Sequence, residues 1–154
     1  MVKNATNDKA DSLAQQLQES EARFREIIEK TPAGVCITDE KGIFEYVNPA
    51  YCQIYGYEAA ELLGKHFTKV VPQEHKSLLS DLHDKFIKDK TEIRGEWEVQ
   101  DKKGNILNIL ADAAYITGAD ERPRKVTFVI NITERKKAEQ QLVQLNETLE
   151  KRIW

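Results

Sequence analysis

The 154-residue chain lacks the features that several common classes of protein require. It has only two cysteines, Cys36 and Cys52, which excludes the disulfide framework of small secreted domains. Its longest run without a formal charge is the twelve residues from Tyr46 to Tyr57, whereas a membrane span needs ~18–20. No apolar stretch follows the lysine near the N-terminus, as a secretory signal would require. These absences predict a cytoplasmic protein with two reduced thiols and no membrane contact in this segment.

An excess of positive charge is missing as well. The chain has 23 Lys and Arg against 26 Asp and Glu, a formal net charge of −3. We therefore expect no nucleic-acid partner. The glycine-rich nucleotide loops, HExxH and GxSxG are absent from the sequence. The adjacent pair His83-Asp84 points in two directions on a helix and makes no acid–base dyad. We expect neither catalysis nor a metal site.

The N-terminal part of the chain predicts one long helix. Residues 1–10 are polar and have no periodicity, so we interpret them as a disordered lead. A capping box formed by Ser12 and Gln15 then opens a helix over residues 11–30, and Thr31-Pro32 ends it. One apolar stripe follows this helix, formed by Leu13, Leu17, Phe24 and Ile27.

Residues 133–154 predict a second helix, which contains neither glycine nor proline. Its apolar residues recur at 4-3-4 spacing, at Ala138, Leu142, Leu145 and Leu149. Such a narrow seam suits a partner helix in a coiled coil better than a globular core. We therefore expect a homodimer through the flanking helices, either parallel or antiparallel. The alternative is a single helix that folds back on its own domain.

Residues 31–132 predict a compact α+β domain with strands at both ends and helices in the middle. The turn Asp39–Gly42 joins two strands, and Asn48-Pro49 starts the helical section. The later strands are expected at Glu92–Gln100, Asn105–Ile116 and Val126–Ile132. Hairpins at both ends imply a five-stranded antiparallel sheet with its helices collected on one face.

Several short stretches together resemble the PAS sensor domain family over residues 20–137, in family order and at family spacing. They are Ser20–Arg25, Thr31–Val35, Asp39–Ile43, Tyr46–Tyr51, Gly56-Tyr57, Glu61–Lys65, Gly95–Trp97 and Asn131–Arg135. The sequence departs from the family in two places. Lys103-Gly104 replaces a usual Asp-Gly, and Asn131-Ile132-Thr133 replaces a usual Asp-Ile-Thr. Asn131 keeps a hydrogen-bonding group at that joint but lacks the charge for the salt bridge that the aspartate often makes.

The resemblance implies a PAS fold and a dimeric sensory module whose flanking helices pass a signal to an output domain. Asn131, Ile132 and Thr133 would form the relay joint between sheet and helix. The tail 141–152 looks like the linker that often precedes a histidine kinase. We therefore expect a covalently linked output domain, absent from this chain, in a two-component sensor kinase or a cyclic-dinucleotide enzyme.

The resemblance leaves the question of a cofactor open between three alternatives. LOV photochemistry is excluded, because the segment His66–Val71, where the family's reactive cysteine would stand, has no thiol. Haem is the sharper alternative, with His83 or His75 as the iron ligand. Flavin ranks behind it, with Trp97 in the region of a tryptophan that some flavin-binding members carry. We favour no cofactor and a histidine that is partly buried or faces solvent.

A small organic ligand is a further alternative to a filled core, and we favour the filled core. The same inward-facing residues would line a pocket or fill that core. They are Ile37, Phe44, Leu79, Leu82, Phe86, Ile109, Ala111, Ala113 and Phe128.

Overall fold

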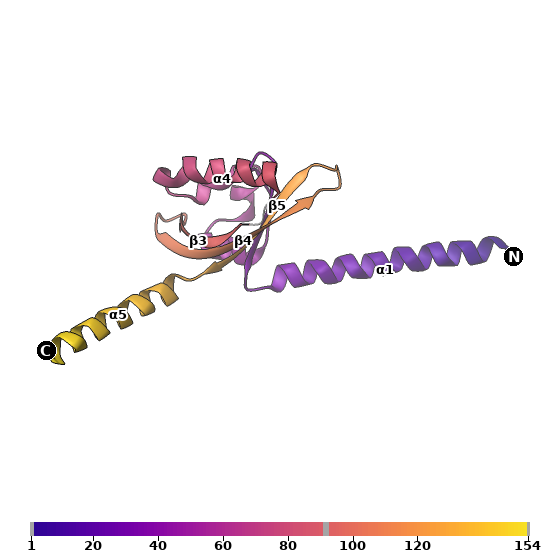
Figure 1. Ribbon diagram of the computed structural model, residues 1–154. Coiled ribbons are helices and arrows are strands. Elements are labelled where there is room, and N and C mark those ends of the chain that lie inside the picture. Colours follow the sequence, from indigo (N-terminus) through magenta and orange to yellow (C-terminus); the bar gives the residue numbers. More distant parts are fainter. Residues whose placement is uncertain (1, 91–92, 154) are drawn as a thin grey trace. The chain divides into compact units, whose positions relative to one another are not determined.

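A computed structural model describes the backbone of residues 2–90 and 93–153 and the side chains of residues 7–90 and 93–152 (Figure 1). The chain forms two compact units, and the boundary between them lies between residues 32 and 33 of the sequence. The first consists of helix α1 (Val2–Lys30) and the two residues that follow it. The second holds all the strands and the remaining helices.

Helix α1 starts earlier than the sequence predicted. It begins at Val2, so residues 2–10 are helical and the expected disordered lead is wrong. Ser12 and Gln15 lie inside the helix and not at its start. No glycine or proline interrupts this stretch, so nothing breaks the backbone hydrogen-bond ladder. The predicted stripe is exposed, at 58–68%, along Leu13, Leu17, Phe24 and Ile27.

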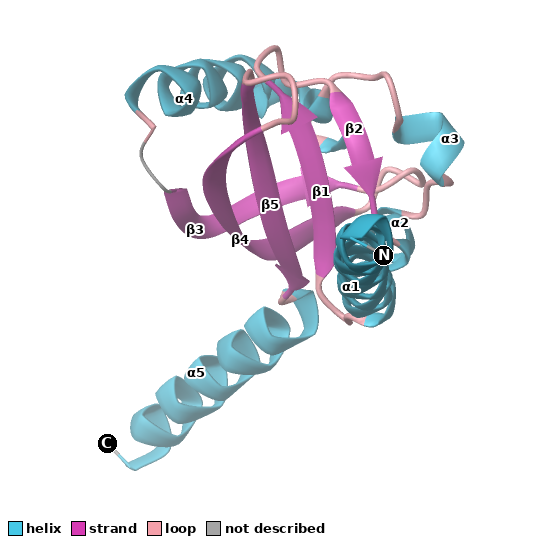
Figure 2. Ribbon diagram, turned by 90° about the vertical axis from the view of Figure 1, so that its right-hand side faces the viewer, coloured by secondary structure: helices cyan, strands magenta, loops and turns pink. Residues whose placement is uncertain are grey.

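The second unit is built on a five-stranded antiparallel sheet, as predicted (Figure 2). Its strands are β1 (Gly34–Asp39), β2 (Phe44–Val47), β3 (Ile93–Gln100), β4 (Ile106–Thr117) and β5 (Pro123–Asn131). Their order across the sheet is β2-β1-β5-β4-β3, which puts the first and last strands side by side at the centre. The expected start of β3 at Glu92 lies outside the described residues.

The helices lie between β2 and β3 in the sequence and cover one face of the sheet (Figure 1). They are α2 (Pro49–Tyr55), α3 (Ala59–Leu62), the 3-10 turns η1 (Phe67–Val70) and η2 (Gln73–His75), and α4 (Lys76–Asp89). Asn48 caps α2, since its Oδ1 accepts from the Tyr51 amide at 2.9 Å. The same oxygen accepts from the Val35 amide at 2.8 Å, so one buried side chain joins α2 to β1.

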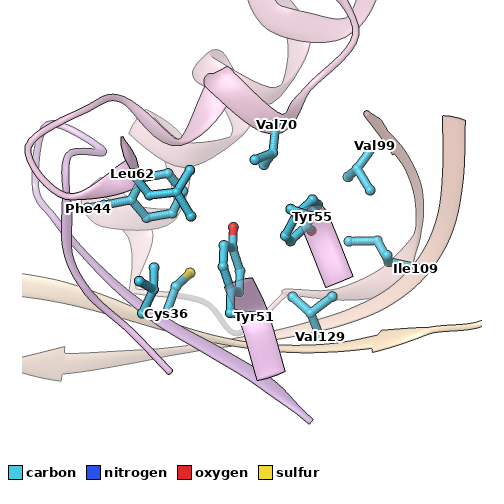
Figure 3. Packing of buried hydrophobic residues seen from close by; sticks show 10 residues of the cluster. Cys36, Phe44, Tyr51, Tyr55, Leu62, Val70, Val99, Ile109 and Val129 are labelled. Carbon is cyan, nitrogen blue, oxygen red and sulfur yellow. The ribbon is translucent and has the colours of Figure 1, made fainter. Parts of the chain in front are cut away.

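The core lies between these helices and the sheet (Figure 3). Tyr51 and Tyr55 project from α2 into its centre, with ring centroids 4.6 Å apart. Around them pack buried side chains from the sheet and the helical section, namely Cys36, Phe44, Val47, Leu62, Val70, Val99, Ile109 and Val129.

The inward face of β5 is the opposite of the one predicted. Phe128 and Ile130 are 42% and 52% exposed, whereas Val129 between them is 1% exposed. The predicted alternation is present, but an alternating pattern does not say which of its two faces is covered. Ile132, expected in the same strand, lies beyond its end and is buried at 3% exposure.

The same correction applies to Ile37 on β1. Its neighbours Cys36 and Thr38 are almost fully buried, at 3% and 0% exposure, whereas Ile37 is only partly buried. Ile37 pairs with Val126 of β5, next to the outward-facing Phe128. Ile37 and Phe128 therefore belong to the sheet face that the helices leave uncovered.

Helix α5 (Thr133–Ile153) follows β5 directly and begins at the predicted residue. Its seam leucines are 47–59% exposed, at Leu142, Leu145 and Leu149, and Ala138 is exposed as well. Within the described residues, α5 therefore does not bury this seam against its own domain. None of the helices in that part of the chain combines the length and apolar character needed to cross a membrane.

Candidate functional site

A cavity of about 120 Å³ lies on the helix-covered face of the sheet, between the strands and the segments η1 and α4. The core is therefore not completely filled, contrary to the favoured expectation. Five of the predicted pocket residues line the cavity: Leu79, Leu82, Ile109, Ala111 and Ala113. Trp97, Val70 and Val99 add to its apolar wall.

The remaining predicted pocket residues lie elsewhere. Phe44 and Phe86 are buried, at 2% and 0% exposure, but are not part of the cavity wall. Phe86 packs against Tyr115, with ring centroids 6.2 Å apart. Ile37 and Phe128 are also absent from the wall, because their strands turn the neighbouring residues inward.

The polar part of the cavity wall includes Thr38, Lys125 and His83, of which sequence reasoning singled out only His83. Thr38 and Lys125 are directly paired on β1 and β5. Side chains paired in this way have Cβ atoms ~4.5–5.5 Å apart on one face of the sheet. The sequence prediction placed the apolar Val126 and Phe128 on the inward face of the strand. Because Lys125 lies at the alternate position, the same prediction placed the lysine on the outward face.

Lys125 brings a cation into this apolar site. Its Nζ lies 4.3 Å from the ring centroid of Phe67 and 6.0 Å from that of Phe86. None of the carboxylates in the described residues forms an ion pair with it. Burial lowers the pKa of Lys125 to about 8, an effect that the nearby Cys36 partly opposes. The ammonium is stabilised mainly by aromatic faces.

His83 is buried at 2% exposure, more deeply than the sequence suggested. Its Nε2 lies 3.1 Å from the carbonyl oxygen of Glu40. Because a carbonyl only accepts, Nε2 carries the proton and Nδ1 of the neutral ring has a free lone pair. Nδ1 has no hydrogen-bond partner among the described residues. Burial, reinforced by Lys125, lowers the pKa of His83 to about 4, so the ring is neutral at pH 7.

His75 lies outside the cavity. It belongs to η2, its side chain is 41% exposed, and its Nε2 is 3.8 Å from a carboxylate oxygen of Glu98. It is thus the solvent-facing histidine of the two expected haem ligands.

The cavity does not fit haem or flavin. Sites for drug-sized ligands have volumes of ~300–1,000 Å³, and this cavity measures about 120 Å³. His83 could offer iron only Nδ1, because Nε2 donates to Glu40. Trp97 lines the same small space. Among the described residues, no three His, Cys, Asp or Glu side chains gather as a metal site requires.

Cys36 and Cys52 both belong to the core region, and they are not joined by a disulfide. Cys36 lines the cavity, and burial raises the pKa of its thiol. Burial likewise raises the pKa of the neighbouring Tyr51 well above its usual range. Cys36 is therefore a neutral wall residue and not an activated nucleophile.

The predicted relay joint is a hydrogen-bonded connection between three elements. Asn131 Oδ1 accepts from the Thr133 amide at 3.1 Å, at the start of α5. Thr133 Oγ1 in turn accepts from the amide of Asn108 on β4 at 3.0 Å. The Ile132 amide donates to the Asn108 carbonyl oxygen at 2.8 Å. The first turn of α5 is thus held by the adjacent strand and not only by the strand that leads into it.

An acidic residue on β3, which sequence reasoning missed, holds the same helix by charge. Glu96 lies 2.5 Å from Lys136 Nζ and 3.5 Å from Arg135 Nη2. The hydrogen bond from Lys136 lowers the pKa of the Glu96 carboxyl. Asn131 lacks the charge of the usual aspartate, and here Arg135 pairs with Glu96 instead.

The strand residues that hold α5 stand next to residues of the cavity wall. Glu96 precedes Trp97 on β3, and Asn108 precedes Ile109 on β4. Successive strand residues point to opposite faces of a sheet. The Glu96 side chain therefore points to the face opposite the cavity, whereas Asn108 holds α5 through its backbone, directly before the wall residue Ile109.

Comparison with known proteins gives one family and a consistent set of relatives. The family described as the PAS fold matches residues 22–132. A high-affinity cAMP-specific and IBMX-insensitive cyclic phosphodiesterase of Mus musculus is 28% identical over 105 residues, covering 68% of this chain and 13% of that protein. The sensor histidine kinase TmoS of Ectopseudomonas mendocina is 25% identical over 135 residues, covering 86% of this chain and 14% of that protein.

Among solved structures, the PAS domain of an HTR-like protein from Haloarcula marismortui has a TM-score of 0.69 at 16% identity. The match covers 79% of this chain and 99% of that PAS domain's chain. The chain spans only about a seventh of the length of the two curated relatives it matches. The match to residues 22–132, together with the sheet order and the helix-covered face, shows that this chain belongs to the PAS fold family of sensor domains.

Proposed function

We propose that this chain is a sensing and relay module that dimerises through its flanking helices and passes a conformational signal to a linked output domain. The similarity to the sensor histidine kinase TmoS supports a histidine kinase as that output domain. The observation that carries the proposal is the arrangement of β3 and β4. Their inner face lines the cavity, and α5 is held by the Glu96 side chain on the other face of β3 and by the backbone of Asn108 in β4.

The relay step follows from this arrangement. A ligand that displaces Trp97 or Ile109 also displaces the strand residues beside them, Glu96 and Asn108. Those two residues hold Lys136 and Thr133 of α5. A ligand shifts the equilibrium between two helix positions by as much as it prefers one of them. The first turn of α5 is therefore the element that a signal in the cavity would move.

The exposed seam of α5 supports dimerisation as the output geometry. Leu142, Leu145 and Leu149 recur at coiled-coil spacing and are 47–59% exposed. Apolar residues in such a row gain stability by packing against a second helix. Helix α1 carries a similar exposed stripe. Pairing of two copies would convert a shift at the joint into a change of helix register or splay.

The test is a fusion of residues 1–154 to the catalytic region of a histidine kinase, with autophosphorylation as the readout. Thr133→Ala removes the acceptor for the Asn108 amide, and we expect basal kinase activity to change several-fold. Thr148→Ala is the matched control, because this α5 threonine bonds only to Gln144 of its own helix in the described structure. We expect it to leave the activity unchanged.

Equal activity of the Thr133→Ala and Thr148→Ala fusions would contradict the relay. Asn131→Ala provides a second variant at the joint, since its side chain accepts from the Thr133 amide. Ile132 is a poorer choice than the sequence suggested. It is buried at 3% exposure, so replacing it would disturb packing as well as the joint.

A further inference from the structure

Some polar groups in the cavity wall have no hydrogen-bond or ion-pair partner among the described residues. Thr38 Oγ1 and His83 Nδ1 are buried and have no hydrogen-bond partner among the described residues. Thr38 is 0% exposed and His83 is 2% exposed. Lys125 adds a cation without a carboxylate partner in the same part of the chain. Buried polar groups and charges without partners destabilise a fold, so their gathering at one cavity indicates a ligand.

These three groups lie close together in the fold, although they are far apart in the sequence. Thr38 and Lys125 are a direct cross-strand pair on the inner face of the sheet. Lys125 Nζ lies 4.3 Å from the ring centroid of Phe67, and the His83 ring centroid lies 5.3 Å from it. Phe67 thus contacts both the cation and the imidazole, and all four residues line the cavity.

The remainder of the wall limits the size and character of a ligand. It is apolar and includes Leu79, Leu82, Val70 and Trp97. At about 120 Å³, the cavity is comparable to an engineered protein cavity of ~150 Å³ that admits benzene. A ligand of this size can have one ring or a short branched chain, with one polar group at the Lys125 end.

We propose that the cavity binds a small monocarboxylate with an apolar body, whose carboxylate accepts hydrogen bonds from Lys125 and Thr38. The inference rests on the proposed sensing function and names the chemical class of the signal. The lysine ammonium provides the opposite charge and the threonine hydroxyl a second donor. Neutral His83 offers only an acceptor at Nδ1, which a carboxylate cannot satisfy, so the carboxylate would pair with Lys125 and Thr38 alone. A dianion such as phosphate would find too few donors in so apolar a wall.

Benzoate and its neutral isostere benzamide are the probes for this proposal. Both are titrated into the full chain and followed by calorimetry, at a pH below 8 so that Lys125 is charged. We expect benzoate to bind at least about tenfold more tightly than benzamide, because a hydrogen bond between charged groups is roughly twice as strong as a neutral one. Lys125→Met keeps an unbranched side chain of nearly the same length but without the charge, and it is expected to remove that preference.

Two further variants separate binding from folding. Lys103→Met, in the exposed turn between β3 and β4, is the matched control and should preserve the preference. Thr38→Val replaces the unpartnered hydroxyl by a methyl group of similar size. We expect it to weaken benzoate binding several-fold while the melting temperature of the unliganded chain stays the same or rises. It tests the proposal even if Lys125→Met does not fold.

Equal affinity for benzoate and benzamide, or equal loss in the Lys125→Met and Lys103→Met variants, would overturn the carboxylate assignment. Absence of binding by either probe would overturn it as well. None of these results bears on the kinase fusion, whose readout depends on Thr133 and not on the ligand. A failed relay and a wrong ligand class are therefore distinguishable.

Discussion

His83 links the cavity to pH. Burial lowers its pKa to about 4, with a contribution from Lys125, while Asp84 and the hydrogen bond to Glu40 act in the opposite direction. An unfolded histidine titrates near 6.5. Between pH 4 and 6.5 the unfolded chain therefore binds more protons at this site than the folded chain does. The free energy of unfolding must rise with pH across that window and level off above it.

We expect this histidine to account for roughly 2–3 kcal/mol of stability that is lost as the pH falls from 7 to 4. Urea unfolding at a series of pH values measures it. His83→Gln retains a donor for Glu40 and should flatten the profile, whereas the exposed His75→Gln should not. His66, whose pKa burial also lowers, contributes a part that remains in both variants. A His83→Gln profile as steep as that of the unmodified chain would contradict the assignment.

Gly42 provides a second prediction at the residue scale. Its φ is +85°, and an added Cβ would lie 2.7 Å from His66 Nε2 and 2.9 Å from a Phe67 ring carbon. Gly64 has a similar φ of +79°, but a Cβ added there would have no atom within 4 Å of it. The left-handed conformation alone costs a non-glycine residue roughly 1–2 kcal/mol.

We therefore expect Gly64→Ala to destabilise by about that amount. Gly42→Ala should cost roughly 1–3 kcal/mol more, because the methyl group overlaps the His66 and Phe67 rings. Thermal unfolding of the two variants gives the comparison. Equal losses would mean that the rings move aside without cost.

At the scale of elements, strand β5 has an apolar stripe on the face opposite to its buried one. Val129 and the cavity residues Lys125 and Thr127 face the helices, while Phe128 and Ile130 lie on the uncovered face. The mixed character of the inner face is what brings a cation to the cavity. A fully apolar inner face would pack well but would recognise no charge.

The stability contributions of two phenylalanines test this orientation. Phe86 is 0% exposed and Phe128 is 42% exposed. We expect Phe86→Ala to lower the free energy of unfolding by roughly 3–5 kcal/mol, and Phe128→Ala by roughly 1 kcal/mol, since only part of its area is covered. Chemical denaturation of both variants decides the matter. A larger loss for Phe128 would place it in the core, as the sequence pattern suggested.

For the whole molecule, the proposed dimer predicts which residues of α5 would pack between two copies. Leu142 and Leu145 lie on the predicted seam of α5 and are 59% and 55% exposed. Val143 is 56% exposed as well but falls outside the 4-3-4 pattern. Substitutions at these three residues therefore distinguish a specific seam from a general effect of exposed apolar side chains.

We expect Leu142→Glu or Leu145→Glu to weaken the dimer at least tenfold, because a carboxylate would have to be buried between helices. Val143→Glu should leave the dimer intact. Sedimentation equilibrium gives the dissociation constants, and circular dichroism checks that each variant stays folded. A monomeric chain at high concentration, or equal effects of all three changes, would contradict a seam at these positions.

The types of the elements and their order could be predicted from sequence because their signals are local. Asn48 before Pro49, the turn Asp39–Gly42 and the seam of α5 each act over a few residues, and all of them lie where expected. The start of α1 was missed for the same reason. Residues 2–10 carry no helix signal of their own, and the structure continues the helix through them.

The composition of the cavity wall depends on relations that no local pattern contains. An alternating strand pattern is compatible with either face of the strand pointing inward. Only the packing of α4 and η1 on the sheet decided that Lys125 faces the cavity and Phe128 does not. Strand pairing then placed Thr38 beside Lys125, and the same packing brought His83 to them. Sequence by itself therefore determined the family, the order of the elements and the residues that join β5 to α5. Tertiary structure alone decided the chemistry of the cavity, because its polar groups come from three distant segments that meet only when the sheet and helices pack.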